Sequence, residues 1–335
     1  MKVCHFIASR GLGRGETYVD LINELCTTIE IVLLVPKGAL FIPRVDNRIQ
    51  IIEYGAKDSR RNPFLYLELY SQFKRIKPEL VHTHFAKATE IFNRLNKILN
   101  MPWVSTKHNP RKGRIFNQVD QVIAVSKVVA ESVSHDRVKI IHNGISPEVL
   151  PPVGEKNKLF TIIAVGRLEK VKAFDRLVTE CSKLSFEFKL LLVGDGPEKS
   201  SLVDLVSSLD IDKKVDFLGY RSDIPELMRQ SDVIVVCSQS EGFSMVILEG
   251  LFYGEILVSR NVGIASQLLP DMFLIKKYEI ATKLEEVFRT PELFKAAFAT
   301  LRKSQGTQYL IKRTADEHIG FYQSITSKSL NNKIS

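Results

Sequence analysis

The sequence contains little cysteine, and the cysteines that it has are far apart. Four occur in 335 residues, at Cys4, Cys26, Cys181 and Cys237. A disulfide-stapled scaffold needs more of them at closer spacing, and no pair has the spacing of metal ligands. We therefore expect reduced thiols, which are typical of a cytoplasmic protein.

Long apolar runs are also missing. No stretch reaches the roughly 20 apolar residues that a membrane-spanning helix requires. Residues 1–8 look like a short strand that leads into a loop, without the charged and then apolar pattern of a signal peptide. The sequence also lacks repeats and an interleaved aromatic and basic platform. We therefore expect a cytoplasmic protein that binds no nucleic acid.

Basic side chains outnumber acidic ones, and the basic excess is unevenly distributed along the chain. The chain has 47 Lys and Arg against 38 Asp and Glu, which gives a net charge of +9. Residues 1–150 hold 22 of the basic and 14 of the acidic side chains, so they carry nearly all of the excess. Such a field attracts anionic partners. The partners we expect are a phosphorylated or lipid-linked glycan or an anionic membrane surface.

Apolar runs typical of buried strands alternate with segments of helical spacing along the whole chain. This alternation predicts an α/β protein with parallel sheets flanked by helices. Residues 151–158 are rich in proline, glycine and charge, as linkers often are. We expect two Rossmann-like domains, at residues 1–150 and 158–306, that face each other across a cleft.

A basic loop follows the predicted strand of residues 160–165. Arg167 and Lys172 lie in this loop, just ahead of a predicted helix. The guanidinium of arginine is a planar fork that suits phosphate oxygens, and lysine supplies a flexible point charge. The two residues would neutralise a diphosphate beside a helix N-terminus. The alternative is a basic surface loop without a ligand.

A second loop follows the apolar strand of residues 232–237. Glu241 lies at this strand-to-helix junction, and Glu249 lies in the helix that begins near Met245, with seven residues between the two acids. Loops at the carboxyl ends of parallel strands are where open α/β sheets bind polar ligands. The alternative is a strand-helix unit with two solvated glutamates.

Four motifs stand in order in the second half of the chain. They are Val165-Gly-Arg-Leu-Glu-Lys-Val-Lys172, Leu192-Val-Gly-Asp-Gly-Pro-Glu198, Val215-Asp-Phe-Leu-Gly219 and Ser240-Glu-Gly-Phe243 with Glu249. They resemble the C-terminal domain of the retaining glycosyltransferases of family 4, which have the two-domain GT-B architecture. In that architecture the last helix usually crosses back to the first domain, and residues 307–327 are the candidate.

The resemblance implies a donor site for a nucleotide-sugar, in particular a UDP-sugar. Arg167 and Lys172 would hold the leaving diphosphate, Glu249 the ribose hydroxyls, and Glu241 the donor sugar. The other donor-binding candidates in this domain are Gly166, Tyr220, Arg221, Gly242, Phe243 and Ser244. No metal or other cofactor is expected, because the two cations would neutralise the diphosphate and no Asp-x-Asp motif is present.

A glycine-rich loop, Gly11-Leu-Gly-Arg-Gly15, follows the first predicted strand. A nicotinamide site is disfavoured, because the glycine spacing differs from Gly-x-Gly-x-x-Gly and the acid expected after the second strand is missing. The loop better resembles the family's Gly-Gly-x-Glu loop, with Arg14 at the second glycine. Gly13 and Gly15 are then donor-side candidates, and Arg14 is an acceptor-side candidate.

Two histidines of the first domain are further candidates. His108 matches the family's strand-end histidine near the donor sugar and would take part in catalysis, whereas His84 would lie on the acceptor side. His82 and His84 share one face of a strand, a spacing that suits a metal, but no third ligand is evident in the sequence. The alternative is a set of hydrogen-bonded core or loop histidines.

The resemblance predicts a retaining glycosyltransferase of hexosyl or N-acetylhexosaminyl type. Its acceptor would be a glycan or lipid-linked glycan in bacterial surface polysaccharide or lipopolysaccharide synthesis. Departures from the family pattern, such as Ala173 in place of glycine, leave the four charged candidates intact. The alternatives are a sugar-nucleotide epimerase of the same architecture and a non-catalytic nucleotide- or glycan-binding protein.

Residues 59–77 combine aromatic and aliphatic side chains with basic flanks. Such a segment can lie on an anionic bilayer, although a core-packing helix of the first domain would show the same pattern. We therefore expect a cytoplasmic protein that associates peripherally with the inner membrane.

Overall fold

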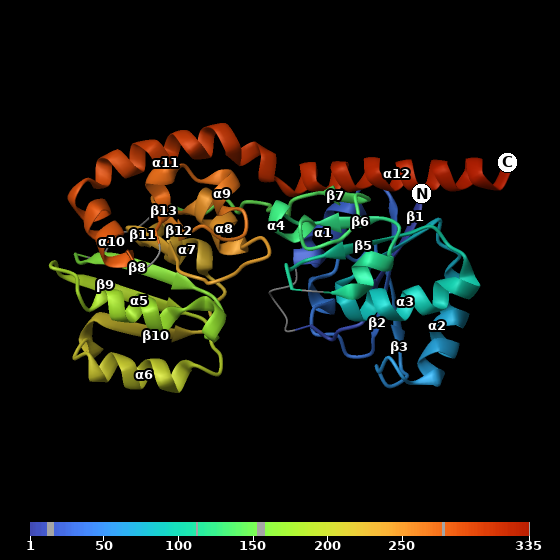
Figure 1. Cartoon of the computed structure of the whole chain (residues 1–335), viewed down its shortest axis with the longest axis horizontal. Coiled ribbons are helices and arrows are strands. Elements are labelled where there is room, and N and C mark those ends of the chain that lie inside the picture. The colour runs from blue at the N-terminus through green and yellow to red at the C-terminus, as the bar shows by residue number, and fades with distance from the viewer. Residues whose placement is uncertain (12–16, 112, 153–157, 277–278, 335) are drawn as a thin grey trace. The chain divides into compact units, whose positions relative to one another are not determined.

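The structure is a computed structural model that describes residues 1–11, 17–111, 113–152, 158–276 and 279–334, with the backbone alone described for residues 328–334. The chain forms two compact units (Figure 1). The first contains Met1–Ser146 and Leu310–Ser335, and the second contains Pro147–Tyr309.

A parallel sheet of seven strands forms the centre of the first unit, in the order β3-β2-β1-β4-β5-β6-β7. The strands are β1 (Lys2–Ile7), β2 (Glu30–Pro36), β3 (Gln50–Tyr54), β4 (Leu80–His84), β5 (Trp103–Lys107), β6 (Val122–Ala124) and β7 (Val138–Ile140). The helices are α1 (Thr17–Leu25), α2 (Pro63–Ile76), α3 (Phe85–Leu99), α4 (Lys127–Ala130) and α12 (Ile311–Ile334).

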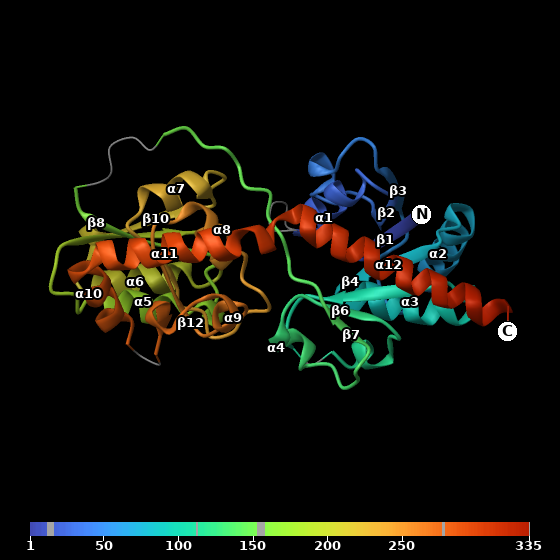
Figure 2. The same ribbon diagram turned by 90° about the horizontal axis from the view of Figure 1, so that it is seen from above.

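Alternate residues of β1 enter two different hydrophobic cores. Cys4 and Phe6 join the core that contains the buried side chains of α2 and α3, whereas Val3 and Ile7 join the core that contains those of α1 and α12. Successive side chains of a strand point to opposite faces, so His5 lies on the α1 and α12 side. Figure 2 shows α12 running along the first unit beside α1.

The second unit has a parallel sheet of six strands, in the order β10-β9-β8-β11-β12-β13. The strands are β8 (Phe160–Val165), β9 (Phe188–Val193), β10 (Val215–Gly219), β11 (Val233–Val236), β12 (Leu257–Arg260) and β13 (Leu274–Ile275). The helices are α5 (Phe174–Cys181), α6 (Lys199–Ser208), α7 (Ile224–Gln230), α8 (Met245–Tyr253), α9 (Ala265–Leu268), α10 (Ile280–Arg289) and α11 (Pro291–Gln305).

Both sheets reverse their strand order at one point. The reversal lies between β1 and β4 in the first unit and between β8 and β11 in the second. Ligands of open α/β sheets bind outside the carboxyl ends of the strands at such a switch point. The prediction of two Rossmann-like parallel-sheet domains is confirmed. In the part of the chain that the structure describes, no helix is both long and apolar enough to cross a bilayer.

Candidate functional site

The loops after β8 and β9 lie against each other through glycines. A Cβ on Gly194 would lie 2.0 Å from the carbonyl oxygen of Gly166, and one on Gly196 would lie 2.5 Å from that of Leu168. The amide of Gly166 donates to Val193, across the strand ends. Side chains are therefore excluded at both glycines, and the backbone of the loop after β8 is held in place by the neighbouring loop.

Lys172 and Glu241 meet at the switch point of the second sheet. Lys172 ends a short 3-10 turn, Lys170–Lys172, and its Nζ lies 2.6 Å from Oε1 of Glu241. Two bonds hold the turn against the end of β11: the amide of Gln239 donates to the carbonyl of Val171 (2.7 Å), and Sγ of Cys237 donates to that of Lys172 (3.1 Å). The ion pair is therefore positioned by backbone contacts between two loops.

Arg167 lies on the same loop as Lys172 but has a different partner. Its guanidinium lies 2.8 Å from Oε1 of Glu169, and its side chain is 58% exposed. Both predicted phosphate-binding cations are thus paired with carboxylates of the chain itself. Exposed ion pairs contribute little, about 0–1 kcal/mol, so an incoming anion can compete with Glu169 for Arg167.

Ser244 has an unfavourable backbone conformation at the start of α8. Its φ is +76°, and its side chain is 6% exposed. Its buried Oγ has no hydrogen-bond partner among the described residues. Strained, unsatisfied positions of this kind gather at ligand sites. The turn between β12 and α9 holds the loop that contains Ser244, because the amide of Ile264 donates to the carbonyl oxygen of Phe243. The two backbones lie so close that a Cβ on Gly263 would be 2.3 Å from the same carbonyl oxygen.

The remaining donor-side candidates lie on neighbouring elements of the second unit. Glu249 is half-buried on α8. Burial chiefly, with help from Glu249 and other carboxylates, raises the pKa of Tyr253 one turn further on. Tyr220 is exposed after β10, and Arg221 forms a two-point ion pair with Asp223 at 2.8 and 2.5 Å. The Arg221 hydrogen bonds hold the pKa of the Asp223 carboxyl below its usual range.

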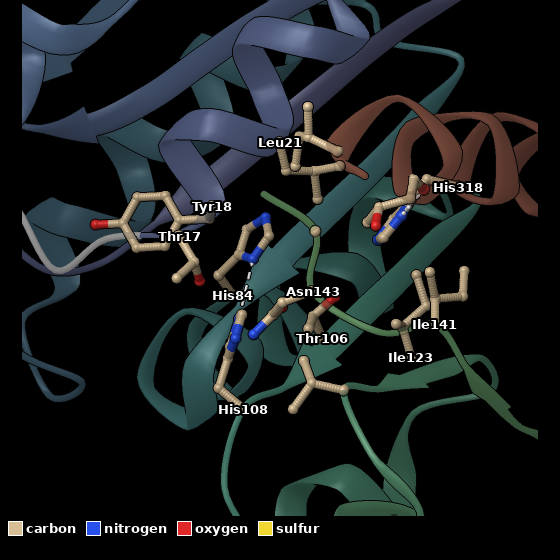
Figure 3. Close-up of a pocket in the computed structure, with 14 residues that line it drawn as sticks. Thr17, Tyr18, Leu21, His84, Thr106, His108, Ile123, Ile141, Asn143 and His318 are labelled. Carbon is tan, nitrogen blue, oxygen red and sulfur yellow. Dashed lines mark hydrogen bonds between the residues drawn. The ribbon is translucent and has the colours of Figure 1, made fainter. Parts of the chain in front are cut away.

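A histidine network lies at the switch point of the first sheet. His84 Nδ1 lies 3.3 Å from His108 Nε2, and His84 Nε2 lies 3.0 Å from His5 Nδ1. Figure 3 shows a pocket beside this network, with His84 facing His108 and with His318 of α12 on its far side. Tyr18, Thr106 and Asn143 also line the pocket.

Burial keeps these rings neutral. Burial lowers the pKa of His5 and of His108 to about 3 and that of His318 to about 4. It also lowers the pKa of His82 and of His84. A neutral imidazole has one donor and one acceptor nitrogen. His108 therefore cannot offer a positive charge near pH 7, but it can donate to, or accept from, a substrate hydroxyl.

Three of these histidines lie close enough together to share a metal ion. Ring nitrogens of His5, His82 and His84 lie within 4.8 Å of one another, and all three side chains are buried. Yet His82 already bonds through both nitrogens, to Tyr322 Oη and Thr106 Oγ1, each at 2.6 Å. The set therefore functions as a hydrogen-bonded network. The third histidine, His5, escaped sequence analysis although it pairs with His82 in the sheet.

Two side chains of α12 also reach this network and were not predicted from the sequence. The rings of His318 and Tyr322 lie 5.9 and 5.6 Å from that of His82. Their spacing of four residues on one helix face was the available signal. The candidates Gly13, Arg14 and Gly15 lie outside the described residues, so their roles stay predictions.

Two family models match adjacent parts of the chain. The model described as Glycosyltransferase Family 4 matches residues 15–149, and the model described as Glycosyl transferases group 1 matches residues 147–304. Together the two matches span both compact units of the chain. A solved Anabaena structure, HepE in complex with UDP-glucose, has the same fold at a TM-score of 0.83 and 18% identity, covering 97% of this chain and 100% of that one.

Named relatives of these glycosyltransferase domains align over shorter spans. An uncharacterized glycosyltransferase of Methanocaldococcus jannaschii is 29% identical over 58% of this chain and only 59% of its own length. The lipopolysaccharide core biosynthesis glycosyltransferase LpsE of Rhizobium meliloti is 24% identical over 78% of this chain and 79% of its own. An Escherichia coli UDP-Gal:alpha-D-GlcNAc-diphosphoundecaprenol alpha-1,3-galactosyltransferase is 26% identical over 76% and 75%.

Proposed function

We propose that this protein is a retaining glycosyltransferase of family 4 that moves a sugar from a UDP-sugar to a glycan or lipid-linked glycan. The observation that carries the proposal is the Lys172–Glu241 pair at the β8–β11 switch point. Three residues after Glu241, the buried hydroxyl of Ser244 has no hydrogen-bond partner in the part of the chain that the structure describes. The R. meliloti relative, a lipopolysaccharide core biosynthesis glycosyltransferase, supports a role in lipopolysaccharide or surface polysaccharide synthesis. The E. coli relative, a galactosyltransferase for a diphosphoundecaprenol-linked sugar, supports a lipid-linked acceptor. The neighbour bound to UDP-glucose supports the donor class.

The reaction breaks the bond between the anomeric carbon and the diphosphate. Negative charge grows on the leaving oxygen while the sugar becomes cationic. In our proposal Arg167 and Lys172 stabilise the diphosphate, together with the amides at the start of α8. The loop contacts described above already position the backbone of Lys172, whereas Arg167 would exchange Glu169 for the diphosphate. No metal is required for this step.

Other residues would orient the donor. Glu241 would act on the sugar hydroxyls while its second oxygen keeps the contact with Lys172, and the backbone of Gly242 and Phe243 would add donors. Glu249 would hold the ribose, and Tyr220 with Arg221 would flank the base. We assign no side-chain nucleophile, and retention of configuration is what the family resemblance implies.

The first domain would bind the acceptor. His108 and His84 lie at its switch point, where a polar ligand is expected. As neutral rings they would orient hydroxyl groups through hydrogen bonds. Arg14 and the glycines beside it would add contacts on this side. The site of action would be the cytoplasmic face of the inner membrane, with the protein bound peripherally.

A nucleotide-sugar panel tests the proposal. The purified chain is screened by thermal shift with UDP, GDP, ADP and their sugars, and then assayed for nucleoside diphosphate release with bacterial glycolipid. Acceptor-dependent UDP release with an α-linked product supports the proposal. Acceptor-independent conversion of the nucleotide-sugar would indicate an epimerase, and binding without turnover would indicate a non-catalytic protein. Activity that disappears in EDTA and returns with a divalent ion would refute the metal-free step.

A further inference from the structure

Helix α2 carries a second apolar face that the fold of the first unit does not use. Its inner side chains, Leu65, Leu69, Phe73 and Ile76, are buried in the core. On the opposite side, Phe64 is 72% exposed and Leu67 is 67% exposed, and Tyr70 is exposed one turn further on.

The spacing puts these three side chains on one strip of the helix. Residues three apart are neighbours on a helix surface, so Phe64, Leu67 and Tyr70 follow one another over two turns. Single exposed apolar residues are normal on a protein surface. A row of large exposed apolar side chains, on the side of the helix that faces away from the core, marks a candidate interaction site.

Basic side chains flank the strip at both ends of the helix. Arg61, Lys74, Arg75 and Lys77 are all exposed, and Nζ of Lys74 lies 5.7 Å from the centre of the Tyr70 ring. We name the surface formed by Arg61, Phe64, Leu67, Tyr70, Lys74 and Arg75 the α2 outer face.

The nearby acids are engaged within the protein. The carboxylate of Glu68 accepts the amides of Gly55 and Ala56, at 2.9 and 2.8 Å. Asp58 pairs with Lys87 at 2.5 Å. Because these two carboxylates are paired with groups of the protein itself, the unpaired charges around the apolar strip are the basic ones named above.

We propose that the α2 outer face docks the first domain on an anionic lipid bilayer. Phe64 and Leu67 would enter the boundary between headgroups and acyl chains, and Tyr70 would lie at headgroup level. Lys74 and Arg75 would contact lipid phosphates. The inference rests on the proposed function only in that a lipid-linked acceptor gives the contact a purpose. The binding itself requires no catalysis.

Vesicle flotation of the full chain tests the surface. The vesicles contain phosphatidylglycerol with phosphatidylethanolamine, or phosphatidylcholine alone. The test variants are F64S/L67S and K74E/R75E. The matched control is K97E/I98S on α3, where Ile98 is as exposed as Phe64 at 72%. Melting followed by Trp103 fluorescence, and UDP affinity, check that each variant is folded.

The wild type and the K97E/I98S control should float with the anionic vesicles and much less with phosphatidylcholine. Each basic side chain contributes roughly fivefold near an anionic surface, so K74E/R75E should lower the partition coefficient by at least about tenfold. F64S/L67S should lose binding to a similar extent. Equal recovery on both vesicle types, or full binding by folded F64S/L67S, would overturn the proposal.

Further outcomes distinguish membrane docking from dimerisation and from the proposed function. If F64S/L67S converts a dimer into a monomer in sedimentation analysis and leaves flotation unchanged, the α2 outer face binds a second copy, and the proposal is wrong. A wild type that transfers sugar to a water-soluble acceptor but never floats refutes the membrane inference alone. One that floats but releases no UDP with any acceptor refutes the proposed function alone.

Discussion

The Nζ atom of Lys172 lies 2.6 Å from Oε1 of Glu241, although 69 residues separate the two in the sequence. Their side chains are only 22% and 12% exposed. Water screens a partly buried pair less than a surface pair, and removing one partner leaves the other charge uncompensated. The pair is therefore the most sensitive point of the proposed donor site.

Replacing this ammonium should impair turnover, and it should also destabilise the fold because the carboxylate of Glu241 loses its partner. Lys172→Ala removes a charge that would stabilise the leaving diphosphate, so kcat should fall by about 100- to 1000-fold, the usual cost of one preorganised donor. Steady-state UDP release measures this. Lys170→Ala, at an exposed position of the same turn, is the control and should stay near wild type. Equal losses in both variants would mean that the turn matters only for structure.

Glu169 should compete with the donor for Arg167. The Arg167–Glu169 pair is largely exposed, so it contributes at most about 1 kcal/mol. Glu169→Gln should then strengthen UDP binding by up to about fivefold, whereas Arg167→Ala should weaken it. Isothermal titration calorimetry with UDP measures the affinity of both variants. If neither variant changes the affinity, Arg167 does not contact the diphosphate.

The buried hydroxyl of Ser244 should stabilise a ligand rather than the free protein. An unsatisfied buried hydroxyl costs about 1–3 kcal/mol, so Ser244→Ala should leave the free energy of unfolding equal or higher. The same change should weaken UDP-sugar binding by about fivefold or more. Chemical denaturation and titration are measured together, with exposed Ser240→Ala as the control. A destabilised S244A with normal affinity contradicts this role.

Two glycines with positive φ should respond very differently to alanine. Gly194→Ala would drive a Cβ to 2.0 Å from the Gly166 carbonyl oxygen, and we expect a loss of at least about 3 kcal/mol in the second unit. Gly219 has a φ of +63°, but a Cβ added there would meet no heavy atom of the described residues within 4 Å, so Gly219→Ala should cost only about 1 kcal/mol. Circular dichroism melts of both variants compare the losses, and similar values would disprove the contact argument.

The histidine network should make the first unit sensitive to acid. Burial lowers the pKa of His318 from 6.5 to about 4, so between these values the unfolded chain binds a proton that the folded chain excludes. Stability should therefore be highest above pH 6.5 and fall as the pH drops toward 4. Each such histidine would contribute about 1.4 kcal/mol per pH unit.

Urea unfolding at several pH values measures this slope. The chain has one tryptophan, Trp103, and it lies in β5 of the first unit, so its fluorescence follows that unit. His318→Gln should reduce the slope between pH 6.5 and 4 by removing one linked proton. A flat profile in the wild type, or an unchanged slope in the variant, would show that the ring is not held neutral by burial.

Much of the fold followed from local pattern. The apolar runs before Gly166 and before Ser238 predicted buried strands, and β8 and β11 occupy those places. Two Rossmann-like sheets also followed from the alternation of strands and helices. The domain bounds expected at residues 1–150 and 158–306 stay a prediction, beside the compact units Met1–Ser146 with Leu310–Ser335 and Pro147–Tyr309. Helix α12, Ile311–Ile334, lies where the family resemblance placed a helix at residues 307–327, but it begins four residues later and ends seven residues later.

The site was only partly readable in the sequence. The loop positions of Arg167 and Lys172 were predicted from strand ends, but their carboxylate partners were not. Ser244 was identified through the family resemblance, and its strain and orphan hydroxyl appear only in three dimensions. His5 was overlooked because a lone histidine in an apolar strand gives no sign of its neighbours.

By itself the sequence determined which segments become strands and helices, because side-chain periodicity along the chain is a local property. It also placed the charged candidates at the ends of those strands. Tertiary structure alone decided that β8 lies beside β11 and β1 beside β4. Strand order is a long-range outcome of core packing, and it brings Glu241 to Lys172 and His5 to His84, which no spacing in the chain encodes.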